Sequence, residues 1–339
     1  MKGVSVLVPA YNEEKSIGKC IQSCLNQTEK PFEIIVVNDG STDNTLEILK
    51  SFGKQIRVID IKKNTGNKSK AQEIGLKYVR TDVFVTTDAD TRLDENFVKQ
   101  IKKSFEDKSI SAVCGYVKSD RNNWLTKVRD INYIIGQTIS KKAQGYINAL
   151  FVIVGCSSAF RTKDFRETIK FDHDNITEDL DFTYQLKLSN KKIDFNDNAI
   201  AFTQDPNTIK SYLKQIYRWY SGGWACLRKN FRIIKQPNNA LILSTVYLEG
   251  LLMGGLFLLF PLILFVNFKY LIYILSVEFF LTSACLTYGA FKQKRYYLFF
   301  YIPHHYAMHI VDNMVFLFTF VKEMIFNKRN LSWNKFERY

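Results

Sequence analysis

The stretch Val83-Phe-Val-Thr-Thr-Asp-Ala-Asp90 decides how the first half of this chain is expected to fold. It is a short apolar run that ends abruptly in two carboxylates, which is typical of a buried strand whose last residues emerge at the edge of a sheet. Asp88 and Asp90 stand one residue apart, so both can reach one hard divalent cation. An isolated Asp-x-Asp is more often a pair of solvated acids in a turn. The interpretation therefore depends on the surrounding sequence.

Apolar runs of the same kind recur on both sides of this stretch and alternate with helical patterns. Continuous apolar strands separated by helices predict a mainly parallel α/β sheet covered on both faces. Such sheets bind ligands at the carboxyl ends of their strands. The expected strands are 4–8, 33–38, 56–60, 83–87, 112–118 and 151–155. The expected helices are about 16–26, 42–52, 68–79, 94–105, 123–146, 179–188 and 209–231.

Polar residues also follow the first two expected strands, as Tyr11-Asn12-Glu13 and Asp39-Gly40-Ser41. These carboxyl ends should meet at the same sheet edge as Asp88 and Asp90, which is the first argument for a nucleotide site. Asp39 would lie where a base or ribose is held, and Tyr11 where it can stack on the base. Considered alone, Asp39 in Asn-Asp-Gly-Ser is a turn residue.

Thr177-Glu178-Asp179 opens another helical pattern. Thr177 can be an N-cap followed by acids that suit the positive end of a helix. A carboxylate at that position, beside a sugar pocket, is also well placed to act as a general base toward an acceptor hydroxyl. The two interpretations are compatible.

Gln215-Ile-Tyr-Arg218-Trp219 places Gln215 and Trp219 one helical turn apart, with Arg218 beside them. Arg218 suits a phosphate, and Trp219 offers a flat apolar face to a sugar ring. The alternative is an amphipathic helix lying on a membrane with interfacial aromatic residues. Both can hold for one helix.

The chain has 339 residues and a formal net charge of +14, so nucleic acid, an anionic membrane surface or a phosphorylated substrate would each suit it. It has no zinc-finger spacing, RNA-binding signature or basic heptad, which argues against nucleic acid. Its six cysteines form no metal or disulfide pattern. Cys20 and Cys24 are one helical turn apart and are expected on the buried face of a helix.

A long apolar block follows residue 239. Segments 240–268 and 270–291 each contain one charged residue, and each exceeds the roughly 20 residues that span a bilayer as a helix. A tight turn at Asn267-Phe268-Lys269 would make them a hairpin. With the preceding domain in the cytosol, the hairpin returns the chain there at Lys292-Gln-Lys-Arg295, as the positive-inside rule requires.

The third apolar segment, 296–326, carries three histidines and Asp312. A simple span would leave Lys328, Arg329 and Lys335 on the far side, against the positive-inside rule. The segment is therefore interpreted either as a span or as an interfacial or re-entrant helix.

Together, these signals resemble membrane-bound members of glycosyltransferase family 2, the group that includes hyaluronan, cellulose and poly-N-acetylglucosamine synthases. The resemblance covers residues 4–219. Its elements are Val8-Pro-Ala-Tyr-Asn-Glu-Glu14, Asn38-Asp-Gly-Ser-Thr-Asp43, Asp88-Ala-Asp90, Gly155 to Arg161, Thr177-Glu-Asp179 and Gln215 to Trp219.

The resemblance implies a GT-A-type, Rossmann-like catalytic domain at 1–235, including the interfacial helix at 209–231, and a membrane region at 236–339. It implies a hexosyltransferase in the cell membrane, with the catalytic domain cytosolic. The donor would be a nucleotide sugar, usually a UDP-sugar, the cofactor Mg²⁺ or Mn²⁺, and the reaction inversion at the anomeric carbon by direct displacement.

Carried onto matching positions, the resemblance makes Asp39 a contact to the nucleoside, and Asp88 and Asp90 contacts to the diphosphate and metal. Asp179 becomes the catalytic base. The remaining donor-side residues are Pro9, Tyr11, Glu13 and Lys68, and the acceptor and pyrophosphate residues are Glu178, Gln215, Arg218 and Trp219. The chain departs from the family where Asn67 replaces a Gly and Glu73 an Asn, which weakens the case for Lys68.

The leading interpretation is an inverting membrane enzyme that extends a polysaccharide. The same transfer made once to a lipid acceptor, such as a polyprenyl phosphate or a glycolipid, is the alternative, and the short membrane block favours it. Two or three helices are few for a channel that carries a growing chain, and self-association would supply further helices. A non-catalytic membrane protein that binds a nucleotide sugar is a different class, against which the complete acidic motifs argue.

Overall fold

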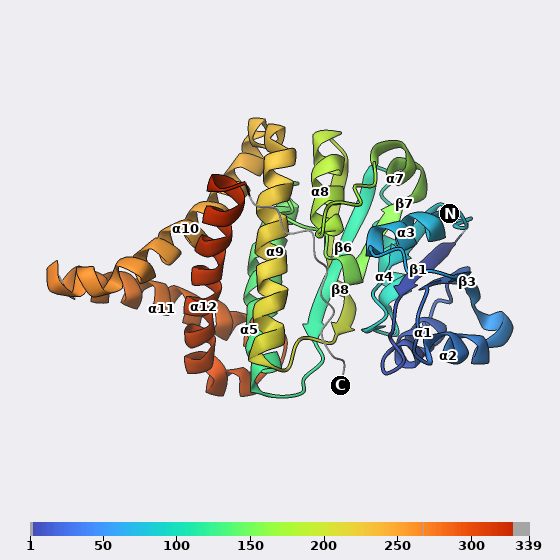
Figure 1. Ribbon diagram of the computed structural model, residues 1–339, viewed down its shortest axis with the longest axis horizontal. Helices are drawn as coiled ribbons and strands as arrows, with labels where there is room; N and C mark the ends of the chain where they lie inside the picture. The colour runs from blue at the N-terminus through green and yellow to red at the C-terminus, as the bar shows by residue number, and fades with distance from the viewer. Residues whose placement is uncertain (1–2, 267, 328–339) are drawn as a thin grey trace.

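The computed structural model describes residues 3–266 and 268–327, in which one eight-stranded sheet is joined to a helical region (Figure 1). The strand order is β3-β2-β1-β4-β7-β6-β8-β5. The strands are β1 Val4–Ala10, β2 Glu33–Asp39, β3 Arg57–Ile61, β4 Val83–Thr86, β5 Thr91–Leu93, β6 Ile110–Ser119, β7 Ser158–Arg161 and β8 Lys192–Thr203. The helices of the sheet domain are α1 Ile17–Leu25, α2 Thr45–Ser51, α3 Lys68–Leu76, α4 Phe97–Ser104, α5 Trp124–Ile135, α6 Lys142–Tyr146, α7 Thr162–Thr168 and α8 Glu178–Leu188. The helices that follow are α9 Ile209–Lys229, α10 Pro237–Val266, α11 Phe268–Lys292 and α12 Ile302–Phe320.

The N-terminal half of the sheet is parallel, as predicted. β1 pairs in parallel with β2 and β4, and β2 with β3. Alternate residues of these strands enter two different cores. Val6 and Val36 pack with α1, α2 and α4 on one face, whereas Leu7 and Ile35 pack with α3, α7 and α8 on the other. Cys20 lies fully buried in the first core, as its helical spacing predicted.

The C-terminal half makes the whole sheet mixed. β7 is antiparallel to both β4 and β6, β8 is parallel to β6, and β5 is antiparallel to β8. The prediction of a strand at 151–155 was wrong. In that segment the Phe151 and Ile153 amides donate to the side chains of Gln144 and Thr183, instead of to a neighbouring strand. The chain then makes a 3₁₀ turn over Gly155–Ser157 before β7 begins.

The expected helix at 123–146 forms in three parts: α5, a π-helical turn at Gly136–Lys141, and α6. Its start is fixed by a capping box, in which Asn123 accepts from the Thr126 amide and the Thr126 hydroxyl accepts from the Asn123 amide. The π turn brings Gln137 and Lys141 to buried positions.

Helices α10 and α11 extend away from the sheet as a pair (Figure 1). Pro237–Phe260 and Ile272–Lys292 are long and apolar enough to cross a membrane, and only 17% of the most apolar window of each is buried inside the protein. Large side chains such as Leu252 and Phe280 are 71% exposed, which suits contact with lipid. The predicted turn includes Asn267, which lies outside the described residues.

The third apolar segment forms α12, which packs against both α9 and α10 (Figure 1). Its residues His305, Asp312 and Asn313 are buried. The Tyr212 hydroxyl on α9 donates to the Asp312 carboxylate at 2.7 Å. This contact ties α12 to α9, and both interpretations of the segment, as a span or as an interfacial or re-entrant helix, stay predictions. Lys328, Arg329 and Lys335, on which the positive-inside argument depended, lie outside the described residues.

Gly75 allows α3 to pack closely on the sheet, because a Cβ there would lie 2.3 Å from Leu7 Cδ1 and 2.8 Å from Val37 Cγ2. We expect Gly75→Ala to lower the free energy of unfolding by about 1–3 kcal/mol through overpacking. Gly18→Ala in α1 is the matched control, since the nearest atom to its Cβ, Ile48 Cγ2, is 3.8 Å away. It should leave stability unchanged or raise it slightly. Urea unfolding in detergent measures both, and equal stabilities for the two variants would contradict the packing argument.

Candidate active site

One cavity of about 700 Å³ lies at the carboxyl ends of the central strands and reaches the helical region. Its walls come from the ends of β1 and β2, the turn after β4, the start of α8, and the inner faces of α9, α10 and α12. The structure brings every predicted site residue to this cavity: Pro9, Tyr11, Glu13, Asp39, Lys68, Asp88, Asp90, Glu178, Asp179, Gln215, Arg218 and Trp219. Residues as far apart in the sequence as Pro9 and Trp219 therefore share one site.

Asp39 organises a loop beside the acidic end of this cavity. Its carboxylate accepts from the Thr65 amide at 2.9 Å and the Thr65 hydroxyl at 2.8 Å. Gly40 follows with φ +65°, and a Cβ there would lie 2.4 Å from the Asn64 amide nitrogen. Only glycine fits this close approach without strain. The turn interpretation of Asp39 is thus compatible with a place in the site, and the bonds to Thr65 left no signal in the sequence.

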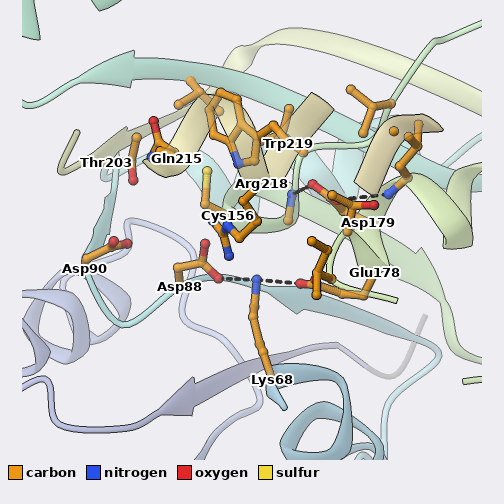
Figure 2. Close-up of a pocket in the computed structure, with 18 of the residues that line it drawn as sticks. Lys68, Asp88, Asp90, Cys156, Glu178, Asp179, Thr203, Gln215, Arg218 and Trp219 are labelled. Atoms are coloured by element: carbon orange, nitrogen blue, oxygen red, sulfur yellow. Dashed lines mark hydrogen bonds and ion pairs between the residues drawn. The ribbon is translucent and has the colours of Figure 1, made fainter. Parts of the chain in front are cut away.

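Lys68, at the start of α3, links the two acidic sides of the cavity. Its Nζ lies 2.6 Å from Asp88 Oδ1 and 2.8 Å from Glu178 Oε1 (Figure 2). Burial alone would lower the pKa of Lys68, but the two carboxylates raise it above its ordinary value. Lys68 therefore remains a cation and holds the turn after β4 against the start of α8.

The two departures from the family pattern both contact one histidine. Asn67 caps α3 by accepting from the Ser69 amide at 2.8 Å, and its Nδ2 donates to the His173 carbonyl at 2.6 Å. Glu73 lies 3.0 Å from His173 Nε2. Asn67 and Glu73 thus attach α3 to the loop before α8, and Lys68 reaches the cavity despite these departures.

Asp88 and Asp90 are the residues of this cavity that could hold a cation at a diphosphate. Asp90 Oδ1 accepts from the Thr91 hydroxyl at 3.0 Å, and Asp88 is paired with Lys68. Within residues 3–266 and 268–327, no three His, Cys, Asp or Glu side chains are grouped to hold a metal ion. Two hard oxygen donors fit a cation such as Mg²⁺, which keeps several waters and takes further ligands from substrate phosphates.

Asp179 sits in the first turn of α8, partly exposed toward the cavity. The Leu180 amide donates to Oδ1 at 2.9 Å and the Gly155 amide to Oδ2 at 3.3 Å (Figure 2). Burial and the neighbouring Glu178 raise the pKa of Asp179 to about 6, while Lys68 opposes that rise. A carboxyl with this pKa is a stronger base than an ordinary aspartate and is still mostly ionised at neutral pH.

Thr177 lies at the predicted N-cap position, but its side chain does not make the capping hydrogen bond. Its hydroxyl donates instead to Asn175 Oδ1 at 3.0 Å. Its side chain packs against α9 at Gly222, where a Cβ would lie 2.5 Å from Thr177 Cγ2. This close approach brings α9 to the start of α8.

α9 supplies Gln215, Arg218 and Trp219, and beneath them lies a buried residue that the sequence reasoning missed. The Arg129 guanidinium on α5 is 4.6 Å from the centroid of the Trp219 ring. It is only 4% exposed. An arginine in an amphipathic helix normally faces solvent, and no motif distinguished this one.

The lining of the cavity becomes apolar toward the helical region. Its far end is lined by the aromatic and aliphatic side chains of Tyr220, Val246, Tyr247 and Phe316. Val246 and Tyr247 belong to α10, the first candidate membrane helix. The site therefore joins an acidic, cation-bearing end to an apolar end beside a helix suited to lipid.

Residues 5–168 match the family described as glycosyl transferase family 2. The chain carries a glycosyl transferase family 2 domain. It is 30% identical over 240 residues to a poly-β-1,6-N-acetyl-D-glucosamine synthase of Staphylococcus epidermidis, a match that covers 68% of this chain and 57% of that protein. A synthase of the same name from Staphylococcus aureus is 28% identical over 235 residues, with the same coverage. The match thus spans a little over half the length of these relatives.

The fold also matches a solved structure, a mannosyltransferase of Pyrobaculum calidifontis in complex with GDP-mannose and Mn²⁺. The TM-score is 0.65 at 16% identity, and the match covers 96% of this chain and 88% of the other. At this identity the likeness concerns the fold alone. It confirms the predicted GT-A-type α/β architecture followed by helices.

The raised pKa of Asp179 has a consequence for stability. A carboxyl whose pKa is higher in the folded than in the unfolded chain favours folding while protonated, and this contribution is lost as the pH rises through about 6. Asp179→Asn removes the buried charge, so its melting temperature should exceed that of the wild type at pH 8 by a few °C, as expected for roughly 1–2 kcal/mol. The gain should shrink toward pH 4.

Thermal unfolding at a series of pH values in detergent measures this difference. Asp174→Asn is the matched control, because Asp174 is an exposed carboxylate in the loop before α8. It should give no pH-dependent gain. An Asp179→Asn variant that melts like the wild type at pH 8 would contradict the prediction.

Proposed function

We propose that this protein is an inverting membrane glycosyltransferase that transfers a sugar from a UDP-sugar to a growing polysaccharide. The observation that carries the proposal is the single cavity in which the ends of β1, β2 and β4 meet the start of α8 and the inner face of α9. The family 2 domain supports the chemistry. The polysaccharide synthases among its relatives support the class of product.

The donor would bind at the acidic end of the cavity. Asp39 would contact the nucleoside beside Pro9, Tyr11 and Glu13, which line the same wall. Asp88 and Asp90 would hold Mg²⁺ or Mn²⁺ at the diphosphate, and the bound cation would neutralise charge on the leaving group.

The chain's own cations would assist the departure of that leaving group. Lys68 lies beside Asp88 and stays protonated. Arg218 lines the same cavity and would pair with phosphate oxygens. Positive charge held in place before the reaction stabilises the diphosphate as it leaves, without reorganisation.

Asp179 would act as the base on the acceptor. Its carboxylate takes the proton of an acceptor hydroxyl while the oxygen of that hydroxyl attacks the anomeric carbon and the bond to the diphosphate breaks. Attack opposite the leaving group inverts the configuration at that carbon. The amides of Leu180 and Gly155 hold the carboxylate in place, and Gln215 and Trp219 would position the acceptor.

The membrane arrangement is part of the proposal. We assign residues 1–235 to a cytosolic catalytic domain and 236–339 to a membrane region in the cell membrane. α10 and α11 would cross as a hairpin and return the chain to the cytosol at Lys292, because positive residues favour that side. α12 would lie at the interface beside α9, and self-association would supply further helices for a channel.

A second candidate function is a single transfer to a lipid acceptor, such as a polyprenyl phosphate or a glycolipid. The observation in its favour is the apolar end of the cavity, where Tyr247 and Phe316 stand beside the candidate membrane helix α10. An apolar chain entering from the bilayer could rest against these side chains while its polar end meets Asp179.

Two measurements decide between these functions. Purified protein in detergent is screened against UDP- and GDP-sugars with Mn²⁺ for nucleotide release, and the product of the active donor is then sized with a radiolabel. A ladder or a high-mass polymer supports polysaccharide synthesis, and a lipid carrying one sugar supports the alternative. Release from none of the donors, with membrane lipids present as acceptors, would refute both.

Asp179→Asn should reduce transfer by about 10²–10⁴-fold, since it removes the base while conserving shape. Binding of UDP with Mn²⁺, measured by calorimetry, should change little, because Asp88 and Asp90 are untouched. Asp174→Asn, the exposed neighbour, should transfer like the wild type. Normal turnover by Asp179→Asn would remove Asp179 from the mechanism.

A further inference from the structure

Arg129 is buried in a cluster of aromatic rings directly behind the site. Its guanidinium carbon lies 4.6 Å from the Trp219 centroid, 5.3 Å from that of Tyr212 and 5.6 Å from that of Tyr133. Trp219 is 36% exposed and lines the cavity, whereas Arg129 is 4% exposed and does not line it. The indole therefore lies between the guanidinium and the space in which a substrate would bind.

The polar contacts of Arg129 reach two further elements. Nη2 donates to Gln215 Oε1 at 3.4 Å, and Nε lies 3.7 Å from Asp205 Oδ1, in the segment that leads from β8 into α9. Tyr133 donates to the same Asp205 oxygen at 2.9 Å. A guanidinium has only donors, so the Gln215 oxygen faces Arg129. The amide NH₂ is then the group that Gln215 can present to a phosphate or a sugar oxygen.

The cluster also includes α12. Tyr212, one of the rings beside Arg129, donates through its hydroxyl to both oxygens of Asp312, at 2.7 and 2.9 Å. Arg129 is thus faced by Asp205 from the segment before α9, by Gln215, Tyr212 and Trp219 from α9 itself, and through Tyr212 by Asp312 of α12. One cation thus contacts three side chains of this part of α9 and the segment that leads into it.

The chemistry of the cluster suits an arginine in particular. A planar guanidinium stacks flat on aromatic faces and donates in a fixed fork, whereas a lysine ammonium meets a ring only as a point charge. A buried Arg–Asp pair gains little net stability over apolar residues of similar volume, because both charges lose their hydration. Stability alone therefore does not account for Arg129, whereas orienting Gln215 and Trp219 does.

The geometry points to Arg129 as a positioning residue, one that holds the amide of Gln215 and the ring of Trp219 in place for the transfer reaction. This inference rests on the proposed function for its kinetic consequence. It assigns Arg129 no contact with the substrate. It predicts that the site loses transfer, but not nucleotide binding, when the guanidinium is removed.

The test must separate positioning from folding, because Arg129→Leu alone would leave Asp205 buried without its partner. We therefore use the double variant Arg129→Leu/Asp205→Asn, which removes both charges, with Asp205→Asn alone as its reference. The matched control is Arg295→Leu/Asp130→Asn. Arg295 and Asp130 are also a buried ion pair, and neither residue lines the cavity. Asp130 directly follows Arg129 in α5.

Two readouts are measured in detergent. Transfer by Arg129→Leu/Asp205→Asn should fall on the order of tenfold or more below both its reference and the control, since small misplacements of positioning groups cost this much. UDP binding with Mn²⁺ should stay within about twofold, because binding that does not differ between ground and transition state is retained. Trp219 emission, isolated by subtracting the matching Trp219→Phe spectrum, should become more accessible to acrylamide.

A folded double variant with the transfer rate and Trp219 quenching of its reference would overturn the inference. If the double variant does not fold, Arg129→Lys decides the question, because it keeps a cation near Asp205 and loses the planar fork. Full activity in Arg129→Lys would then overturn it, and a tenfold loss would support it. If the wild type transfers no sugar, the proposed function fails, and the Trp219 measurement alone decides the role of Arg129.

Discussion

The ion pairs of Lys68 are the interaction on which the site depends. Asp88, Asp90, Glu178 and Asp179 line one cavity, and without a cation among them their charges would repel. Lys68 contacts the two nearest carboxylates, one from each side. The same contact joins the turn after β4 to the start of α8, which are 90 residues apart in the sequence. One side chain thus supplies both charge balance and a structural link.

The pKa of Asp179 shows how this balance matters. Burial and Glu178 raise this pKa, and Lys68 lowers it. The resulting pKa of about 6 is above that of an ordinary aspartate but low enough for the carboxyl to be mostly ionised at neutral pH. Lys68 therefore helps to keep the partly buried Asp179 mostly ionised at neutral pH. Gly155 completes the arrangement, because a Cβ there would lie 3.1 Å from Lys68 Nζ.

The irregular segment before β7 has a structural reason of its own. The amides of Phe151, Ile153 and Gly155 donate to side chains of α6 and α8 and make no ladder with a strand. Their hydrogen bonds are satisfied, as buried amides require, but in a form that holds the segment against α8. One of these bonds, from the Gly155 amide, also holds the Asp179 carboxylate in place.

α9 connects the chemistry to the helical region. Its Gly222 lies against Thr177 at the start of α8, and its Tyr212 is bonded to Asp312 of α12. The helix thus contacts the start of α8 on one side and α12 on the other. This arrangement is compatible with both interpretations of the aromatic residues of α9, which stay predictions.

The sequence by itself determined the parallel half of the sheet, the helices that cover it except α7, and the acidic residues at the strand ends. These follow from local periodicity, because the spacing of apolar residues within about ten positions decides which faces are buried. The acids at the end of β2 and after β4 were found because parallel strands place their carboxyl ends at one edge. The two apolar helices were found because span length is set by bilayer thickness.

Only the tertiary structure decided the partners of these residues. The pairing of Lys68 with Glu178, the contact of Glu73 with His173 and the burial of Arg129 under Trp219 join segments about 90 to 110 residues apart. The missing strand at 151–155 and the place of α12 beside α9 were decided in the same way, by side chains from distant helices. No spacing within a segment records such contacts, because they depend on how whole elements pack in three dimensions.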